Sequence, residues 1–158
     1  MCSGTKYAPA IECFRKAIEI DPREADPRYQ LARIAREQGR YTEAVAHCRD
    51  AAQLDDEHSS SEVWREMGTS SLLAGDAEGA RRMLEKYRER RPYDPEGACW
   101  YGRTMAKLGH PDEARAAFDE AIEAVRTMPA ARRRQVRIWE SEAQKERKNL
   151  AESRVATR

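Results

Sequence analysis

The chain has 158 residues, of which 36% are charged, and its formal net charge at pH 7 is only +1. This balance excludes bulk electrostatic attraction to nucleic acid or to an anionic membrane, although a local patch of one sign can still form. No apolar run is long enough to cross a bilayer. The first residues lack the apolar segment of a secretory signal, so we expect a cytoplasmic protein.

Motifs for catalysis or metal binding are missing from the sequence. There is no glycine-rich phosphate loop, no H-E-x-x-H and no G-x-S-x-G, so we expect no enzyme and no cofactor. The four cysteines are far apart, form no C-x-x-C pair and do not cluster with the histidines at metal-ligand spacing. We therefore expect reduced thiols, and no metal site, at Cys2, Cys13, Cys48 and Cys99.

The first predicted helix spans residues 7–20 and follows a loose segment at residues 1–6. Apolar side chains, Ile11 and Phe14 among them, recur at helical spacing. The helix ends before Pro22, because proline disfavours helical backbone in the residue before it.

Residues 25–58 contain a pair of predicted helices, 27–38 and 42–54. Asp26 is expected to cap the first of them, and Pro27 to occupy its first turn, where the missing N–H costs nothing.

Residues 61–94 predict a second pair of helices, 61–74 and 77–90. The loop before this pair is two residues longer than its counterparts, and its spacing of Ser59 to Glu62 matches a capping box.

Residues 95–128 predict a third pair, 95–108 and 111–126, with Asp94 as the cap of its first helix. The remaining residues, 129–158, predict one long amphipathic helix near 130–152, with Trp139 on its apolar face.

Four rows of residues recur in register with a period of 34 residues. Small residues form one row on the first helix of each pair and a second row on the return helix; larger apolar residues follow one turn later, and a glycine marks each turn. The rows are Ala32, Gly68, Gly102; Ala10, Ala44, Ala80, Ala114; Phe14, Cys48, Leu84, Phe118; and Gly39, Gly75, Gly109. Larger side chains in the small rows would overpack a helix crossing. The glycines suit a left-handed helix C-terminus. Tyr87 interrupts a further row of alanines, so the packing must differ there.

This pattern resembles the tetratricopeptide repeat. The resemblance implies an all-α fold: a right-handed α-solenoid of tetratricopeptide-like helical hairpins in a single domain, 1–158, with a C-terminal amphipathic capping helix. Its parts are a half repeat at 7–24, full repeats at 25–58, 61–94 and 95–128, and a capping helix with tail at 129–158. A non-repeat bundle would explain the helices but not the register.

The resemblance also implies a protein-binding function, because first helices of the family line a concave groove for a peptide. The side chains expected in this groove form a mostly basic strip with two aromatic anchors: Tyr29, Gln30, Arg33, Arg65, Thr69, Trp100, Arg103, Arg133 and Arg137. We therefore predict a protein or peptide partner, acidic in character, held by guanidinium groups. Solvent exposure with internal ion pairing is the plainer explanation of the same arginines.

The family's co-chaperones hold a peptide C-terminus in a clamp of lysines, asparagines and an arginine. Here Arg33 or Thr69 and Glu66 or Trp100 replace the asparagines, so we do not expect a receptor for chaperone tails.

Two alternatives remain open. One is self-assembly as a weak homodimer, because the half repeat at 7–24 lacks the helix that would cover Ile11 and Phe14. The other is nucleic-acid binding through the basic run from Arg132 to Arg137.

Overall fold

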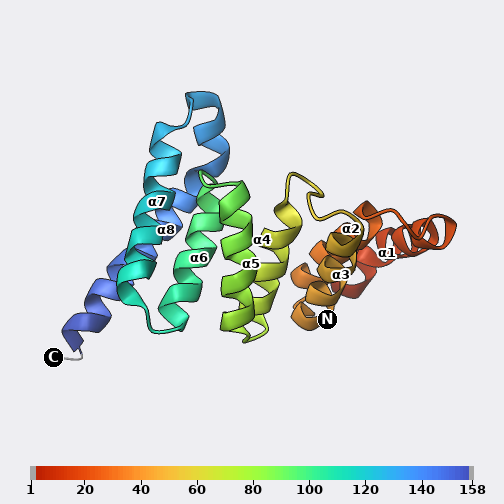
Figure 1. Cartoon of the computed structure of the whole chain (residues 1–158), viewed down its shortest axis with the longest axis horizontal. Coiled ribbons are helices and arrows are strands. Elements are labelled where there is room, and N and C mark those ends of the chain that lie inside the picture. Colours follow the sequence, from red (N-terminus) through yellow and green to blue (C-terminus); the bar gives the residue numbers. More distant parts are fainter. Residues whose placement is uncertain (1–2, 157–158) are drawn as a thin grey trace. The chain divides into compact units, whose positions relative to one another are not determined.

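The computed structural model describes the backbone of residues 3–156 and the side chains of residues 6–153. In this part of the chain there are helices and no strands, as Figure 1 shows. The helices are α1 (Ser3–Ile20), α2 (Asp26–Glu37), α3 (Tyr41–Leu54), α4 (Glu62–Leu73), α5 (Ala77–Arg90), α6 (Pro95–Lys107), α7 (Pro111–Thr127) and α8 (Ala130–Ala156). The predicted all-α helical-repeat solenoid is confirmed.

The two ends of the described chain are more helical than the sequence suggested. α1 begins at Ser3, so the prediction of a loose segment is wrong for residues 3–6, while residues 1–2 lie outside the described part. α8 continues to Ala156, beyond the predicted end at 152. Both extensions follow from helix cooperativity, since each residue added to an existing helix gains a hydrogen bond without a new nucleation cost.

The three turn glycines adopt the backbone conformation that their row predicted. Gly39, Gly75 and Gly109 have φ angles of 75°, 93° and 82°. A Cβ added at any of them would meet no atom within 4 Å, so glycine is needed for the angle rather than for space.

Of the two predicted aspartate caps, one forms and one does not. The carboxylate of Asp94 accepts a hydrogen bond from the backbone N–H of Gly97 at 2.7 Å and caps α6. Asp26 does not cap α2, because it is already the first helical residue and Ala25 occupies the cap position. Its carboxylate instead accepts from the side chain of Gln30 at 3.1 Å.

The loop before α4 does not contain the predicted capping box. α4 begins at Glu62, with Ser61 as its N-cap and no side-chain cap bond. The three serines before the helix adopt the left-handed region, with φ of 53° at Ser59, 55° at Ser60 and 69° at Ser61. A capping box would need Ser59 at the N-cap and residues 60–62 in the first turn of the helix. In the structure residues 59–61 belong to the loop, so the helix begins too late for this motif.

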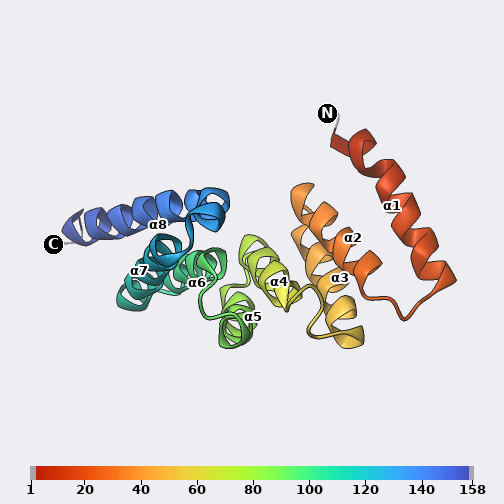
Figure 2. The ribbon, with the colours of Figure 1, turned by 90° about the horizontal axis from the view of Figure 1, so that it is seen from above.

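The chain forms two compact units that divide within α5, between Met83 and Leu84. Unit 1 contains α1 to α4, and α1 packs against α2 (Figure 2). Its buried apolar cluster comprises Ala25, Tyr29, Ala32, Cys48, Ala51, Ala52, Val63 and Met67. Ile11 and Phe14 of α1 are half-buried rather than buried. The division into repeats at residues 25, 61 and 95 stays a prediction.

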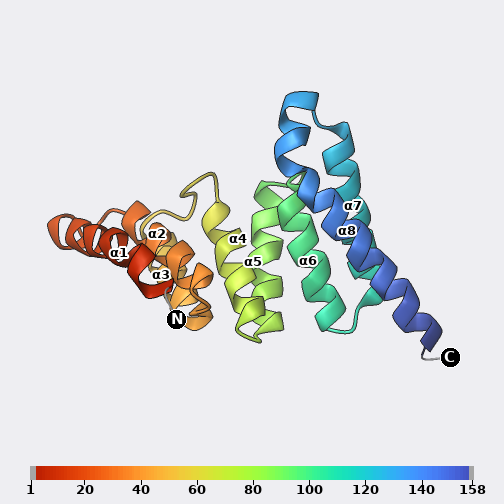
Figure 3. The same ribbon diagram turned by 180° about the vertical axis from the view of Figure 1, so that it is seen from behind.

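Unit 2 is built on the α6–α7 pair, with α8 packed along both helices (Figure 3). Its core includes Leu84, Met105, Phe118 and Ala143, and Trp139 packs against this core from α8. At the predicted crossing, a Cβ added to Gly102 would lie 2.6 Å from Cε1 of Phe118. The small-residue row thus marks a real close approach of two helices.

The exceptional Tyr87 is accommodated by a second glycine. Tyr87 is fully buried in unit 2. A Cβ added to Gly97 would lie 2.6 Å from Cε1 of the Tyr87 ring. The missing side chain at Gly97 therefore makes room for the large ring that replaces an alanine.

Candidate functional site

In unit 1, the predicted anchor Tyr29 is part of a small polar and aromatic cluster. Its side chain is only 4% exposed, and its hydroxyl donates to Glu62 of α4 at 3.4 Å. The ring of His58 contacts it edge-on at 5.2 Å between centroids. Burial, followed by the nearby Glu62 and Glu66 carboxylates, raises the pKa of Tyr29 to about 12. Tyr29 is thus a packed core residue rather than a free anchor.

Arg33 lies next to Tyr29 and forms no ion pair among the described residues. Its guanidinium carbon is 6.0 Å from the centroid of the Tyr29 ring. Among the described residues, its guanidinium donates one hydrogen bond, to the amide oxygen of Gln30 at 3.4 Å. Gln30 also donates to Asp26, so it is held in place beside Arg33. Arg33 therefore keeps most of its donors for an external acceptor.

The α4 members of the predicted strip are less available. Arg65 forms an ion pair with Glu62 at 3.5 Å, and its side chain is 14% exposed. Thr69 is 3% exposed and belongs to the interior. Glu66 is paired with Arg36 of α2, which the sequence did not single out. Of the residues predicted in unit 1, the structure brings Gln30 and the exposed Arg33 together above the buried Tyr29, and places Thr69 inside.

In unit 2, Arg103 of α6 is already bound to two carboxylates of α8. Its Nη2 donates to Glu142 at 2.6 Å and its Nε to Glu146 at 3.0 Å. The guanidinium stacks over Trp100, 4.6 Å from the ring centroid. Trp100 in turn contacts Trp139 of α8, with ring centroids 6.4 Å apart. On α6, Arg103 stacked on Trp100 thus binds two glutamates of α8.

Arg133 and Arg137 of α8 do not join this cluster. Arg133 donates to the backbone carbonyls of Arg126 and Met128 at 2.8 Å and 2.9 Å. It therefore satisfies carbonyls that the end of α7 leaves without helical partners. Arg137 is exposed and forms no ion pair with a described residue.

In the described part of the chain, the two buried thiols, the possible metal ligands and the helices offer no further site. Burial raises the pKa of the Cys99 thiol to about 11 and that of Cys48 well above its usual range, which disfavours reactive thiolates. Residues 3–156 contain no group of three or more His, Cys, Asp or Glu side chains placed to hold a metal ion. None of the described helices combines the length and the apolar character needed to span a membrane.

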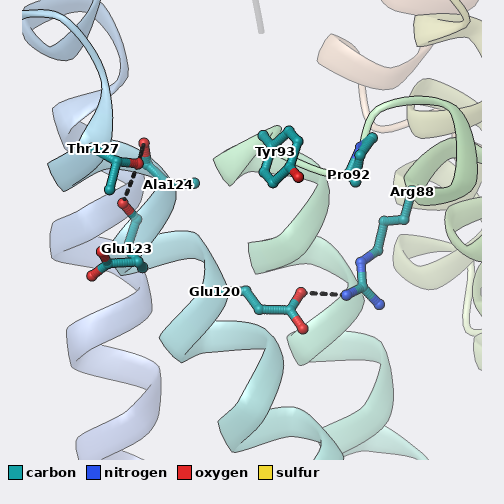
Figure 4. A pocket seen from close by; sticks show the side chains of 7 residues that line it. All are labelled: Arg88, Pro92, Tyr93, Glu120, Glu123, Ala124 and Thr127. Atoms are coloured by element: carbon teal, nitrogen blue, oxygen red, sulfur yellow. Dashed lines mark hydrogen bonds and ion pairs between the residues drawn. The ribbon is translucent and has the colours of Figure 1, made fainter.

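Sequence reasoning missed a surface cavity in unit 2, which Figure 4 shows from close by. It has a volume of about 490 Å³ and is lined by Arg88, Pro92, Tyr93, Glu120, Glu123, Ala124 and Thr127. Tyr93 is 82% exposed, in the loop between α5 and α6. The sequence did contain an indication of an exposed aromatic residue here. Tyr93 lies between Pro92 and Pro95, in a turn rather than on the buried face of a helix.

Comparisons with known proteins agree on one family. Two family models, each described as tetratricopeptide repeat, match residues 13–46 and 71–145 and together cover more than half of the chain. None of the curated proteins gives a significant sequence match.

Solved structures with the same fold are similar at low sequence identity. YrrB, described as a TPR protein with an unusual peptide-binding site, has a TM-score of 0.63 at 23% identity over 72% of this chain, which spans 58% of YrrB. PilF of Pseudomonas aeruginosa has a TM-score of 0.68 at 26% identity, covering 94% of this chain and 67% of its own. The first TPR of Spaghetti (RPAP3), bound to the HSP90 peptide SRMEEVD, has a TM-score of 0.69 at 12% identity, covering 85% and 96%.

Proposed function

Because the chain belongs to the tetratricopeptide-repeat family, we propose that it is a non-enzymatic protein-interaction scaffold that binds an acidic partner peptide on its first helices. The scaffold role rests on the repeats themselves and on family members that bind peptides. YrrB is described as having a peptide-binding site, and the first TPR of Spaghetti is bound to a peptide with three acidic residues. At 12% identity the latter shares only the fold, so it does not name a chaperone as the partner here.

The observation that carries the acidic preference is the Arg103 cluster. Here a guanidinium stacked on Trp100 holds two carboxylates at hydrogen-bond distance, inside the protein itself. This arrangement supports the proposal that a first helix of this chain recognises carboxylates. Forked guanidinium donors match carboxylates in geometry, and stacking on a ring restricts the side chain before it binds.

Arg33 is the counterpart of Arg103 in unit 1 and is the residue that we assign to the partner. Its guanidinium carbon is 6.0 Å from the centroid of the Tyr29 ring and that of Arg103 is 4.6 Å from the centroid of Trp100, and each pair is on a first helix. The difference is that Arg33 has no carboxylate among the described residues. A glutamate or aspartate of a bound peptide would supply it, with Gln30 beside it as a second polar contact.

Direct binding of labelled peptides tests this proposal. Fluorescence anisotropy would compare an acidic peptide of alternating glutamate and serine with its lysine counterpart. We expect micromolar-class binding of the acidic peptide only, because the surface is open and the peptide loses freedom. Arg33→Glu should weaken binding at least tenfold, since a charge-assisted hydrogen bond is worth about 1.5–3 kcal/mol.

The matched control is Arg15→Glu, which reverses an exposed charge on α1, away from Tyr29. Arg15→Glu changes the net charge by as much as Arg33→Glu does, but it should change the affinity for the acidic peptide by less than about twofold. Equal binding of acidic and basic peptides, or equal weakening by the two substitutions, would mean that Arg33 acts only as part of a solvated face.

Self-assembly is the second candidate, and the half-buried strip of α1 favours it. Ile11 and Phe14 are only partly covered by their own chain, and Ile20 at the end of the helix is 85% exposed. A weak homodimer through α1 would cover this strip. Nucleic-acid binding has less support, because Arg133 is engaged with backbone carbonyls and Arg126 with Glu140.

A further inference from the structure

We propose that the surface cavity of unit 2 is a second peptide-binding site, which takes a large apolar side chain that is flanked by a carboxylate. It lies on the second helices and on the turns that follow them. It shares no residue with the predicted first-helix strip, and so it adds a second surface to the proposed function.

The cavity continues into a neighbouring one of about 480 Å³, with four lining residues in common: Pro92, Tyr93, Ala124 and Thr127. We call the two together the Tyr93 groove. Each volume is within the range of about 300–1,000 Å³ that is usual for pockets that enclose a ligand. The shared residues offer a ring, a proline and two small side chains, which form an apolar floor between two polar ends.

The walls of the Tyr93 groove are fixed by contacts within unit 2. Arg88 of α5 forms an ion pair with Glu120 of α7, drawn as a dashed line in Figure 4. The same guanidinium lies 4.2 Å from the centroid of the Tyr101 ring, a cation–π contact that also restrains it. The Thr127 hydroxyl donates to the Glu123 carbonyl at 2.9 Å. A groove with walls held in this way loses little freedom when a ligand enters.

The two ends of the groove differ in charge. At one end are Arg90, Arg91 and Arg132, opposed by Asp94, whose carboxylate already caps α6. Arg91 and Arg132 form no ion pair with a described residue. At the other end Glu120 is neutralised by Arg88, and Glu123 forms no ion pair in the described part. A single carboxylate therefore fits the arginine end, next to the apolar floor.

The same arrangement argues against a polyanion as the occupant. A nucleic-acid strand would place successive phosphates along the groove, and those passing Glu123 would meet a like charge. Tyr93 is the groove's one aromatic ring, where single strands usually find several stacking platforms. Tyr93 would instead cover the apolar side chain of a peptide, as exposed aromatic residues do at binding hot spots.

Three synthetic decapeptides test the proposal, with glycine and serine flanks around the cores Glu-Phe-Glu, Lys-Phe-Lys and Glu-Ser-Glu. Fluorescence anisotropy uses the full chain carrying Arg33→Glu, in which the proposed first-helix site no longer contributes. It should give micromolar-class binding for Glu-Phe-Glu and at least tenfold weaker binding for the other two. Tyr93→Ser, and separately Arg91→Glu with Arg132→Glu, should each weaken Glu-Phe-Glu binding at least tenfold. Tyr93 is exposed, so its substitution should leave the thermal midpoint unchanged.

Two controls separate this site from general charge and from the first-helix strip. Arg134→Glu with Lys145→Glu reverses two exposed charges of α8 outside the groove and outside the first-helix strip, and should change Glu-Phe-Glu affinity less than twofold. Because Arg33 is already substituted in these measurements, they report on the Tyr93 groove alone, so a failure of the Arg33 proposal and a failure of this one give different results. Unchanged affinity in both groove variants would overturn the proposal. So would a labelled single-stranded oligonucleotide that binds more tightly than Glu-Phe-Glu and depends on Arg91 and Arg132.

Discussion

Substitution of Gly102 by alanine should destabilise unit 2, although alanine is the better helix former. A Cβ at this position would lie 2.6, 2.8 and 2.9 Å from three atoms of the Phe118 ring. Carbon atoms in contact are normally about 3.5–4.0 Å apart, so the ring would have to move by about 1 Å. Phe118 is fully buried among core residues that include Met105 and Ile122, so the ring would have to displace its neighbours to move.

Two opposing terms decide the size of the effect. Overpacking a well-packed core usually costs about 1–3 kcal/mol. Alanine recovers up to about 1 kcal/mol relative to glycine in a helix interior. With mid-range overpacking of about 2 kcal/mol, the net loss in the free energy of unfolding should be about 1 kcal/mol. For a unit of this size, that lowers the thermal midpoint by roughly 4–8 °C.

Chemical denaturation followed by circular dichroism measures this change, and a double-mutant cycle identifies its cause. Phe118→Leu alone should destabilise by creating a cavity. In the double variant the added methyl group has room, so the two losses should be less than additive by at least about 0.5 kcal/mol. A Gly102→Ala variant as stable as the parent, or strictly additive losses, would refute the assignment of Gly102 to a close helix crossing.

Three further predictions concern other parts of the molecule. Arg103→Gln should lower the free energy of unfolding by about 1 kcal/mol, because both partner carboxylates on α8 lose a charge-assisted hydrogen bond. This loss of stability should become smaller in high salt, which screens the charges. A difference in denaturation midpoint that does not depend on salt would contradict the prediction. The effect of pH on stability at Cys99 follows from the pKa of its thiol, which burial raises from 9.0 to about 11. The buried neutral thiol stabilises the fold fully below pH 9.0, and this contribution is lost as pH rises through 11, since the unfolded thiol ionises first. The stability difference between parent and Cys99→Ala should therefore decline over that interval in pH-dependent urea titrations, and a constant difference would count against it. Sedimentation should detect a weak dimer that Phe14→Glu removes; a parent protein that stays monomeric at high concentration would exclude the α1 interface.

Helices and turns of this chain follow from local sequence. Positive φ angles at Gly39, Gly75 and Gly109 require a residue without a Cβ, so the position of each turn can be read directly. The row of small residues similarly predicted the crossing at Gly102. Local capping was predicted less well: Asp94 caps its helix and Asp26 does not, because a shift of one residue in the helix start moves the carboxylate out of reach.

The candidate binding residues could be named from the sequence, but their availability could not. Arg33 and Arg103 occupy similar places beside an aromatic residue, yet Arg103 is bound by Glu142 and Glu146 and Arg33 has no such partner. Those glutamates lie 39 and 43 positions away along the chain, so only the packing of α8 against α6 brings them together. The Tyr93 groove likewise depends on the end of α7 lying beside the α5–α6 turn. Periodicity alone determines the helices, their turns and the family, since these depend on backbone conformation and side-chain size over short spans. Which charges remain unpaired, and where a cavity opens, is decided by tertiary packing, because both depend on distances between residues that are far apart in sequence.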